Sequence, residues 1–221
     1  MPQKPEFINN SFFHSKCHTT LHGKDSHLKI MLIDVQNRCL VAANSGFRYS
    51  VLSYVWGNDI SFLRTTTANV GALHKEQALS REAGVPTLID DSIEFMKALG
   101  EKYLWVDSLC LVQDDAEKKY AGIQHMHTVF ARAHLTIVAA SAKDANAPLA
   151  GFRNGTRDPL SSLEIGGKRL EKIKGDPYNE MHLFVYTSRA WTLQEFVMST
   201  RCLVFTYDQV YYRCASAYSL P

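Results

Sequence analysis

Cysteine is scarce in this sequence and shows no pairing pattern. Five cysteines stand among 221 residues, at positions 17, 39, 110, 202 and 214, and the two nearest in sequence are Cys202 and Cys214. No Cys-x-x-Cys pair occurs, which argues against a zinc ribbon, and the odd, scattered set argues against a disulfide framework. We therefore expect reduced thiols and a cytoplasmic protein.

Long apolar runs and a strong net charge are also missing. No apolar run reaches the roughly eighteen residues that a membrane-spanning helix needs, and residues 1–20 lack the apolar core of a secretory signal. The net charge is only +2 with histidine neutral, which is too small to indicate binding through charge alone. We expect neither a membrane nor a nucleic acid as a partner.

Two common nucleotide-binding fingerprints are absent. The sequence contains no GxGxxG motif, so it does not resemble an ordinary Rossmann dehydrogenase, and no GxxxxGK[ST] motif, so a P-loop NTPase is excluded. With 46% hydrophobic and 21% charged residues, the composition is ordinary for a globular chain that buries a sizeable core.

Residues 1–27 are polar and carry four histidines. His14, His18 and His22 have helical spacing, which makes a metal site conceivable. Prolines, Gly23 and the lack of apolar periodicity favour a flexible tail instead. We expect no metal site, and a single domain over residues 28–221.

Short apolar strands alternate with amphipathic helices in that domain. Strands are predicted at residues 28–35, 37–41, 49–56, 103–112, 135–141, 201–205 and 209–214, and helices at residues 72–82, 91–99, 116–133 and 188–197. The alternation predicts βαβ units, and hence an α/β fold with a mostly parallel sheet flanked by helices and peripheral β hairpins. Residues 142–187 contain five glycines and indicate a loop-rich insertion with a minor hairpin.

Three local features refine this prediction. Asp91 is placed to cap a helix, because Glu94 follows at the capping-box spacing, and Gly100 ends that helix. Residues 103–112 form a nearly continuous apolar run, which suits a central strand buried on both faces. Asp107 interrupts this run and, if buried, needs a hydrogen-bond partner.

Ligands of parallel α/β sheets bind outside the carboxyl ends of the strands. That rule places three groups at one edge: residues 56–58, Asp107 and Ser108 with the 113–115 turn, and Ser141. The helix that begins near Ser188 could close over the same edge.

That helix carries Trp191 and Glu195, four residues apart and so on one face. Ser188 is placed to cap it, while Leu193, Phe196 and Val197 are expected to face the core. A carboxylate beside an indole in a cleft is a plausible catalytic pair. The alternative is a surface carboxylate, solvated or paired with Arg189 or Arg201, beside a tryptophan that only packs.

Three blocks together resemble the fungal heterokaryon incompatibility (HET) domain. They are Leu-Ser-Tyr-Val-Trp-Gly at 52–57, Leu-Trp-Val-Asp-Ser-Leu-Cys-Leu-Val-Gln-Asp-Asp at 104–115, and Arg-Ala-Trp-Thr-Leu-Gln-Glu at 189–195. The resemblance covers residues 49–197 and implies a domain that triggers regulated cell death when genetically unlike fungi fuse. The HET family is also remotely similar to Toll/interleukin-1 receptor (TIR) domains, which have a flavodoxin-like sheet and of which some hydrolyse NAD.

The TIR resemblance implies roles for specific residues. Glu195 matches the catalytic glutamate that follows a tryptophan by four residues, here Trp191, and Ser53 and Tyr54 stand where TIR domains have a Ser-Tyr-like turn that leads into the nucleotide loop. The rule on the carboxyl ends of the strands adds Trp56, Gly57, Asp107 and Ser108 to Ser53, Tyr54 and Trp191 as expected substrate contacts. The sequence departs from TIR domains at Val55-Trp56-Gly57, where TIR domains tend to be basic, and residues 142–187 have no TIR counterpart. NAD would be a substrate, with no cofactor. A homo-oligomer and an upstream sensor protein are further expectations.

Cleaving the nicotinamide–ribose bond expels a neutral pyridine, so one carboxylate can suffice where ordinary glycosidases need two. A glutamate can stabilise the positive charge that develops on the ribose. Asp107 could contact substrate or anchor the loops at the strand end. A thiol hydrolase built from Cys110 with His125 or His127 is disfavoured, because Cys110 lies in an apolar run. The alternative to an enzyme is a non-catalytic module that self-associates or binds a partner.

Overall fold

The computed structural model describes residues 28–157, 162–165, 168–171, 184–214 and 217–219. The histidine-rich tail predicted at 1–27, including His14, His18 and His22, lies outside these residues. Within them, no group of three His, Cys, Asp or Glu side chains is arranged to hold a metal ion. None of the helices described there is both long enough and apolar enough to cross a bilayer.

An eight-stranded mixed sheet organises the chain, in the order β10-β9-β8-β5-β3-β4-β1-β2. Its four central strands are parallel: β4 (Tyr103–Trp105), β3 (Ser50–Ser53), β5 (Leu135–Val138) and β8 (Arg201–Phe205). In chain order they lie 2-1-3-4, which is the order of flavodoxin-like doubly wound sheets. The predicted α/β sheet is therefore confirmed at its centre.

Antiparallel strands extend both edges of this parallel centre. On one side are β1 (Lys29–Asp34) and β2 (Cys39–Asn44), and on the other are β9 (Val210–Cys214) and β10 (Ala217–Ser219). The predicted pairings of 28–35 with 37–41 and of 201–205 with 209–214 are both confirmed. The parallel part of the sheet is thus narrower than the alternation of strands and helices predicted.

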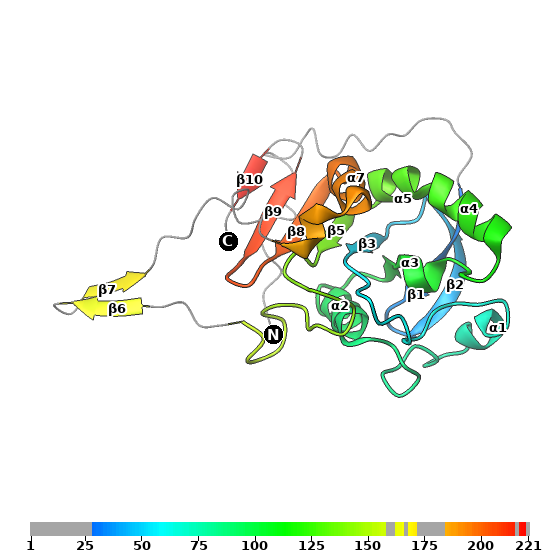
Figure 1. Cartoon of the computed structure of the whole chain (residues 1–221), viewed down its shortest axis with the longest axis horizontal. Coiled ribbons are helices and arrows are strands. Elements are labelled where there is room, and N and C mark those ends of the chain that lie inside the picture. Colours follow the sequence, from blue (N-terminus) through cyan, green and yellow to red (C-terminus); the bar gives the residue numbers. More distant parts are fainter. Residues whose placement is uncertain (1–27, 158–161, 166–167, 172–183, 215–216, 220–221) are drawn as a thin grey trace.

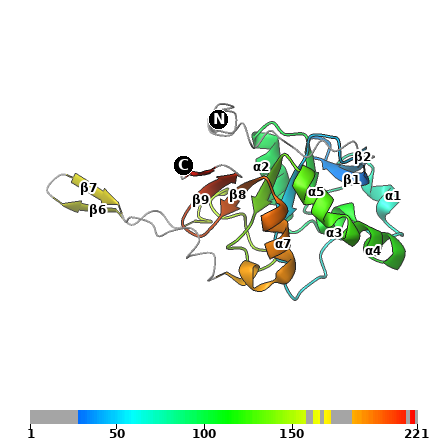
Figure 2. The ribbon, with the colours of Figure 1, turned by 90° about the horizontal axis from the view of Figure 1, so that it is seen from above.

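Helices cover both faces of the sheet (Figure 1). Helix α2 (Thr87–Ala98) lies on one face, and α5 (Met126–Arg132) and α7 (Ala190–Met198) lie together on the other, as the view from above also shows (Figure 2). Right-handed crossovers explain this arrangement. The connection from β3 to β4 moves one way across the sheet, whereas those from β4 to β5 and from β5 to β8 move the other way.

Shorter elements complete the described chain. They are α1 (Val70–Leu73), α3 (Asp107–Cys110), α4 (Ala116–Gln124), the 3-10 helix η3 (Val185–Ser188), and a separate two-stranded sheet of β6 (Ser162–Ile165) and β7 (Lys168–Glu171). The β6–β7 pair is the minor hairpin predicted within the 142–187 insertion.

The core lies between the sheet and its helices. Every residue of β3, β5 and β8 is buried, as expected for strands covered on both faces. Trp105 at the end of β4 is buried and meets the Phe130 ring edge-on at 5.9 Å. The predicted stripe of α2 is confirmed, because Ile89, Ile93 and Met96 are fully buried, and Gly100 follows the helix with a φ of 72° that favours glycine.

The predicted strand at 103–112 was wrong beyond Trp105. Strand β4 ends there, and Asp107–Cys110 form a single helical turn, α3. The Asp107 carboxylate accepts the backbone N–H of Ser108 at 2.7 Å, and the N–H of Cys110 donates to the Val106 carbonyl at 2.7 Å. A side chain that bonds its own neighbouring N–H offers the backbone an alternative to the strand ladder. The acid inside the apolar run was the signal for this turn.

Three helix boundaries also differ from prediction. The helix predicted at 72–82 is reduced to the short α1, which ends at Leu73. The helix predicted at 116–133 is divided at His125 into α4 and α5. Asp91 does not cap α2, which starts at Thr87 after Pro86. Asp91 is instead buried inside α2, where its carboxylate accepts the N–H of Leu149 at 3.0 Å and pairs with Arg153.

Candidate functional site

The carboxyl end of β3 meets helix α7 through one hydrogen bond. Ser53, the last residue of β3, is fully buried, and its hydroxyl donates to Oε2 of Glu195 at 2.5 Å. Strand β3 occupies the centre of the parallel sheet, beside the point where the crossovers diverge. The two residues are 142 positions apart in the chain.

Helix α7 begins differently from the prediction. Its N-cap is Arg189, without a side-chain cap, whereas Ser188 belongs to η3 and donates to the Val185 carbonyl at 2.7 Å. Thr192 takes over the anchoring role. Its buried hydroxyl donates to the Arg189 carbonyl at 2.8 Å and to the carbonyl of Tyr186.

The rotation of α7 also corrects the predicted faces. Phe196 is buried as expected, but the side chains of Leu193 and Val197 are 61% and 58% exposed, so placing them in the core was wrong. Glu195 is half-buried beside Phe196. Helical spacing determines which residues share a face, but the bond from Ser53 to Glu195 and the burial of Thr192 turn that face toward the sheet.

Tyr186 is a site residue that sequence reasoning missed. It is buried, and its hydroxyl lies 2.5 Å from the Ser53 hydroxyl. The Tyr186 hydroxyl also donates to the Thr192 carbonyl at 3.3 Å, and its contact with Ser53 gives a hydrogen-bonded chain that joins Tyr186, Ser53 and Glu195. No motif marks Tyr186, since a lone tyrosine in a predicted loop has no periodic pattern to place it.

A pocket of about 340 Å³ opens beside Glu195. Its lining comes from the segments after β3 and β4, from α4 and α5, and from the start of α7: Tyr54, Trp56, Asp107, Leu111, Gln113, Lys119, Ile123, Met126, Arg189, Trp191, Thr192 and Glu195. Of the residues that the rule for parallel sheets placed at this edge, Trp56, Asp107 and Gln113 line the pocket. Among the predicted residues, Glu195, Tyr54, Trp56, Asp107 and Trp191 line the pocket.

The other predicted residues lie outside the pocket lining. Ser53 and Ser108 are fully buried behind it, where Ser53 supports Glu195 and Ser108 accepts the Tyr54 hydroxyl at 2.9 Å. Gly57 has a φ of 85° and packs so tightly against Asp144 that a Cβ atom would collide with that side chain. Ser141 is buried and bonds the Phe205 carbonyl at 3.4 Å.

The structure shows Asp107 in the anchoring role, one of the two roles that the sequence left open. Its carboxylate accepts the indole N–H of Trp56 at 2.8 Å and the backbone N–H of Ser108 at 2.7 Å, so it anchors the segments that follow β3 and β4. It also lines the pocket. Gln113 adds to this anchoring, because its side-chain amide donates to the Asp107 carbonyl at 2.9 Å.

Comparison with known proteins now decides the family. A sequence model described as Heterokaryon incompatibility protein (HET) matches residues 49–195, well over half of the chain. The chain belongs to the HET family. The matched HET region begins just before β3 and ends at Glu195, so it contains the whole hydrogen-bonded chain from Tyr186 through Ser53 to Glu195. HET membership supports a role in fungal heterokaryon incompatibility.

One relative is Heterokaryon incompatibility protein 6, OR allele, of Neurospora crassa. It is 27% identical over 144 residues, which are 61% of this chain and 19% of that relative. The chain thus matches about a fifth of the length of this relative. No solved structure matches the chain.

Burial dominates the electrostatics of the HET pocket. It raises the pKa of Glu195 to about 8; the Ser53 hydrogen bond and the charge of Arg189 oppose this shift, and the charge of Asp107 adds to it. Burial also raises the pKa of Asp107 to about 6, against the opposing hydrogen bonds from Trp56 and Ser108. At neutral pH Asp107 is therefore largely ionised and Glu195 largely protonated.

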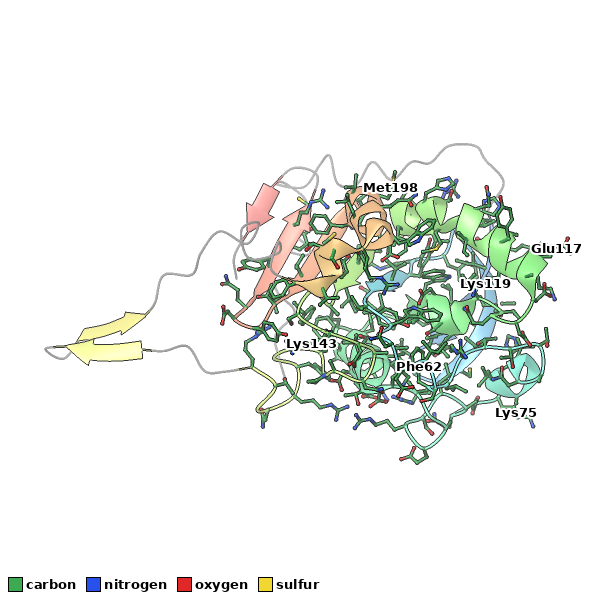
Figure 3. The ribbon with its side chains drawn as sticks, in the orientation of Figure 1. Phe62, Lys75, Glu117, Lys119, Lys143 and Met198 are labelled. Atoms are coloured by element: carbon green, nitrogen blue, oxygen red, sulfur yellow. The ribbon has the colours of Figure 1, made fainter. Side chains whose placement is uncertain are left out.

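Two cations complete the pocket, and sequence analysis had assigned neither to a ligand. Arg189 lines it from the start of α7 and Lys119 from α4. In Figure 3, Lys119 lies on the inner side of α4, whereas Glu117 lies on the outer side of the same helix. A pocket with a protonatable glutamate, two tryptophans and two cations suits an anionic ligand that also carries a flat, positively charged ring.

Proposed function

We propose that this HET domain is a cell-death effector that hydrolyses NAD to nicotinamide and ADP-ribose, with Glu195 as the catalytic residue. The observation that carries the proposal is the placement of Glu195. Glu195 is half-buried, its carboxyl is held by the Ser53 hydroxyl at 2.5 Å, and it lines a pocket together with Trp56 and Trp191.

The reaction needs only one carboxylate. The bond between the nicotinamide nitrogen and the ribose C1′ breaks, its electron pair leaves with the neutral pyridine, and positive charge develops on the ribose. The ionised Glu195 stabilises this charge. Water then forms the new C1′–O bond, and its proton passes to Glu195 and on to solvent. The cationic substrate itself favours the ionised carboxylate, because an opposite charge nearby lowers the pKa of a carboxyl group.

The other residues in the pocket lining have complementary roles in this proposal. Trp56 has its indole fixed by the 2.8 Å bond to Asp107, and Trp191 is 57% exposed at the rim. Stacking of the nicotinamide cation on an indole contributes roughly 0.5–2 kcal/mol. Arg189 and Lys119 supply the positive charge that a pyrophosphate requires.

Nicotinamide release by the purified chain tests the proposal. We expect wild type to release nicotinamide and Glu195→Gln to lose at least about a hundredfold in rate. Glu117→Gln is the matched control, because it makes the same change at an exposed position outside the pocket. Equal rates for wild type and Glu195→Gln would contradict the assignment of Glu195. No release by wild type across a wide range of protein concentration would exclude NAD hydrolysis by this chain alone.

A second candidate function is a non-catalytic module that self-associates or receives a signal from an upstream sensor. The observation that favours it is the outer face of α7, where Leu193, Val197 and Met198 are 61%, 58% and 42% exposed. Exposed apolar side chains close together often mark protein–protein contacts. In this alternative, loss of toxicity follows changes on that face and not Glu195→Gln.

A further inference from the structure

A second and larger hollow lies away from Glu195. It is a groove of about 900 Å³ between the β1–β2 hairpin on one side and α3, α4 and α5 on the other. Figure 1 shows α4 beside this edge of the sheet. The volume is within the roughly 300–1,000 Å³ range of small-molecule sites.

The walls and floor of this groove are mainly aliphatic. Its floor includes the buried side chains of Trp105, Cys110 and Val129. The walls come from both sides of the groove, and their residues are at least partly exposed: Leu28, Ile30, Met31, Ala42, Ala43, Leu111, Val112, Ala121 and Gly122. Because the methionine side chain is unbranched and flexible, Met31 can adjust its conformation to an apolar ligand in the groove.

The charged side chains in the groove lining share one sign. They are Lys29 and Lys118, and none of the described lining residues is acidic. Lys118 is held by Asp115 at 2.9 Å. Lys29 is exposed and forms no salt bridge with any described residue, so its ammonium group can bind an anion.

We propose that this groove binds a free long-chain fatty acid. The alkyl chain would lie over Trp105, Cys110 and Val129, and the carboxylate would meet Lys29 at the rim. The aliphatic lining selects the chain, and the one-sided charge selects an anionic head group over a cationic one. The proposal does not depend on NAD hydrolysis. Leu111 lines both hollows, so the groove and the Glu195 pocket share one side chain.

Binding of cis-parinaric acid to the full chain tests this inference directly. We expect saturable fluorescence enhancement that palmitate displaces. In a series of saturated fatty acids, affinity should rise with length by up to about fourfold per buried methylene, until the groove is full. Dodecyltrimethylammonium, with a cationic head, should bind at least tenfold more weakly than dodecanoate.

Two pairs of variants locate the site. Ala121 lines the groove from an exposed position on α4, so Ala121→Trp should fill it and weaken palmitate binding at least tenfold. Ala116→Trp, exposed on the same helix but outside the groove, should not. Lys29→Glu should weaken binding of the carboxylate several-fold, whereas Lys75→Glu, exposed elsewhere on the chain, should leave it unchanged.

Several outcomes would overturn the inference. They are no saturable binding by the full chain, affinity independent of chain length, or equal binding by Ala121→Trp and Ala116→Trp. Circular dichroism of each variant separates loss of the site from loss of the fold, and Lys29→Glu at the exposed rim remains a test if Ala121→Trp misfolds.

Discussion

The hydroxyl of Ser53 bonds the carboxyl of Glu195 at 2.5 Å, and joins the end of a central strand to a helix 142 residues later. This contact places an acid with a pKa of about 8 at the carboxyl edge of the parallel strands. The Ser53 hydroxyl also forms a hydrogen bond with the Tyr186 hydroxyl at 2.5 Å. The orientation of Glu195 therefore depends on two residues that lie behind the pocket, outside its lining.

The pH dependence of activity should report Glu195. The pKa of Glu195 in the folded domain is about 8. The pH dependence of kcat/KM reports the pKa values of catalytic groups in the free enzyme. We therefore expect kcat/KM for nicotinamide release to rise with pH toward a plateau above pH 8. The profile of kcat should be shifted to lower pH, because bound cationic substrate favours the carboxylate. A kcat/KM profile that is flat from pH 6 to 9 would contradict the role of this carboxyl.

Ser53→Ala should shift that profile. The Ser53 hydrogen bond lowers the pKa of Glu195, so its loss should move the kcat/KM profile to higher pH and reduce the rate at neutral pH. The buried Tyr186 hydroxyl would lose its contact with Ser53 but keep the Thr192 carbonyl at 3.3 Å as an acceptor, so we expect a cost of about 1 kcal/mol in the free energy of unfolding. Rates measured over a pH series, with urea unfolding beside them, check both effects. An unchanged profile would mean that Ser53 only packs.

Tyr186→Phe tests Tyr186 as a positioning residue. The ring remains to fill the buried space, but the hydrogen bond with the Ser53 hydroxyl is lost. We expect kcat to fall several-fold with little change in KM, because Glu195 loses its orientation while the residues in the pocket lining remain. Combining this change with Ser53→Ala should be clearly less than additive, as for residues in one hydrogen-bonded network. Additive effects would show that the two residues act independently.

The stability of the fold should decrease as pH rises. The folded pKa of Glu195 is about 8 against a usual value of 4.5, so between these values the folded chain binds more protons than the unfolded chain. The stabilisation is complete below pH 4.5 and is lost as pH approaches 8, at up to about 1.4 kcal/mol per pH unit. Asp107 adds in the same direction between its usual 3.8 and about 6.

Urea unfolding at pH 5, 6.5 and 8 measures this dependence. Glu195→Gln should remove most of the slope above pH 6 and be more stable than wild type at pH 8, since no buried charge then forms. Glu117→Gln, at an exposed position, should retain the wild-type slope. Parallel slopes for wild type and Glu195→Gln would show that Glu195 is ionised freely in the fold.

The two tryptophans in the pocket lining should respond differently to truncation. Trp191 is 57% exposed, so Trp191→Ala should cost under about 1 kcal/mol in stability while raising KM for NAD about tenfold. Trp56 bonds Asp107 at 2.8 Å and meets Phe62 edge-on at 5.9 Å. Trp56→Ala should therefore destabilise by about 3 kcal/mol as well as weaken binding. Unfolding and initial-rate measurements on both variants distinguish the roles.

Charged substitutions on the outer face of α7 test the alternative function. Leu193 and Val197 are exposed and one helical turn apart, so Leu193→Glu and Val197→Glu should leave stability within about 0.5 kcal/mol of wild type. If α7 forms contacts between copies of the chain, both variants should sediment as smaller species than wild type at equal concentration. Unchanged sedimentation would remove this face as an assembly surface.

Local sequence patterns were enough to predict the centre of the sheet and part of the pocket lining. Alternating strands and helices predicted the parallel centre of the sheet, and the spacing of Trp191 and Glu195 placed both at one pocket. Adjacent parallel strands end at the same edge, so the segments containing Trp56 and Asp107 could be brought together before any contact was known.

The remaining features depend on contacts between distant residues. Asp107 ends a strand because its carboxylate bonds a neighbouring N–H, a choice that hydrophobicity alone does not reveal. No sequence pattern marks Tyr186, and Lys119 shares the pocket lining with Asp107 although the two residues belong to different helices, α4 and α3. Helical periodicity says which side chains share a face of α7, but not which face turns inward. Tertiary packing settles that rotation, because burying Thr192 and bonding Glu195 to Ser53 leaves Leu193 and Val197 in solvent.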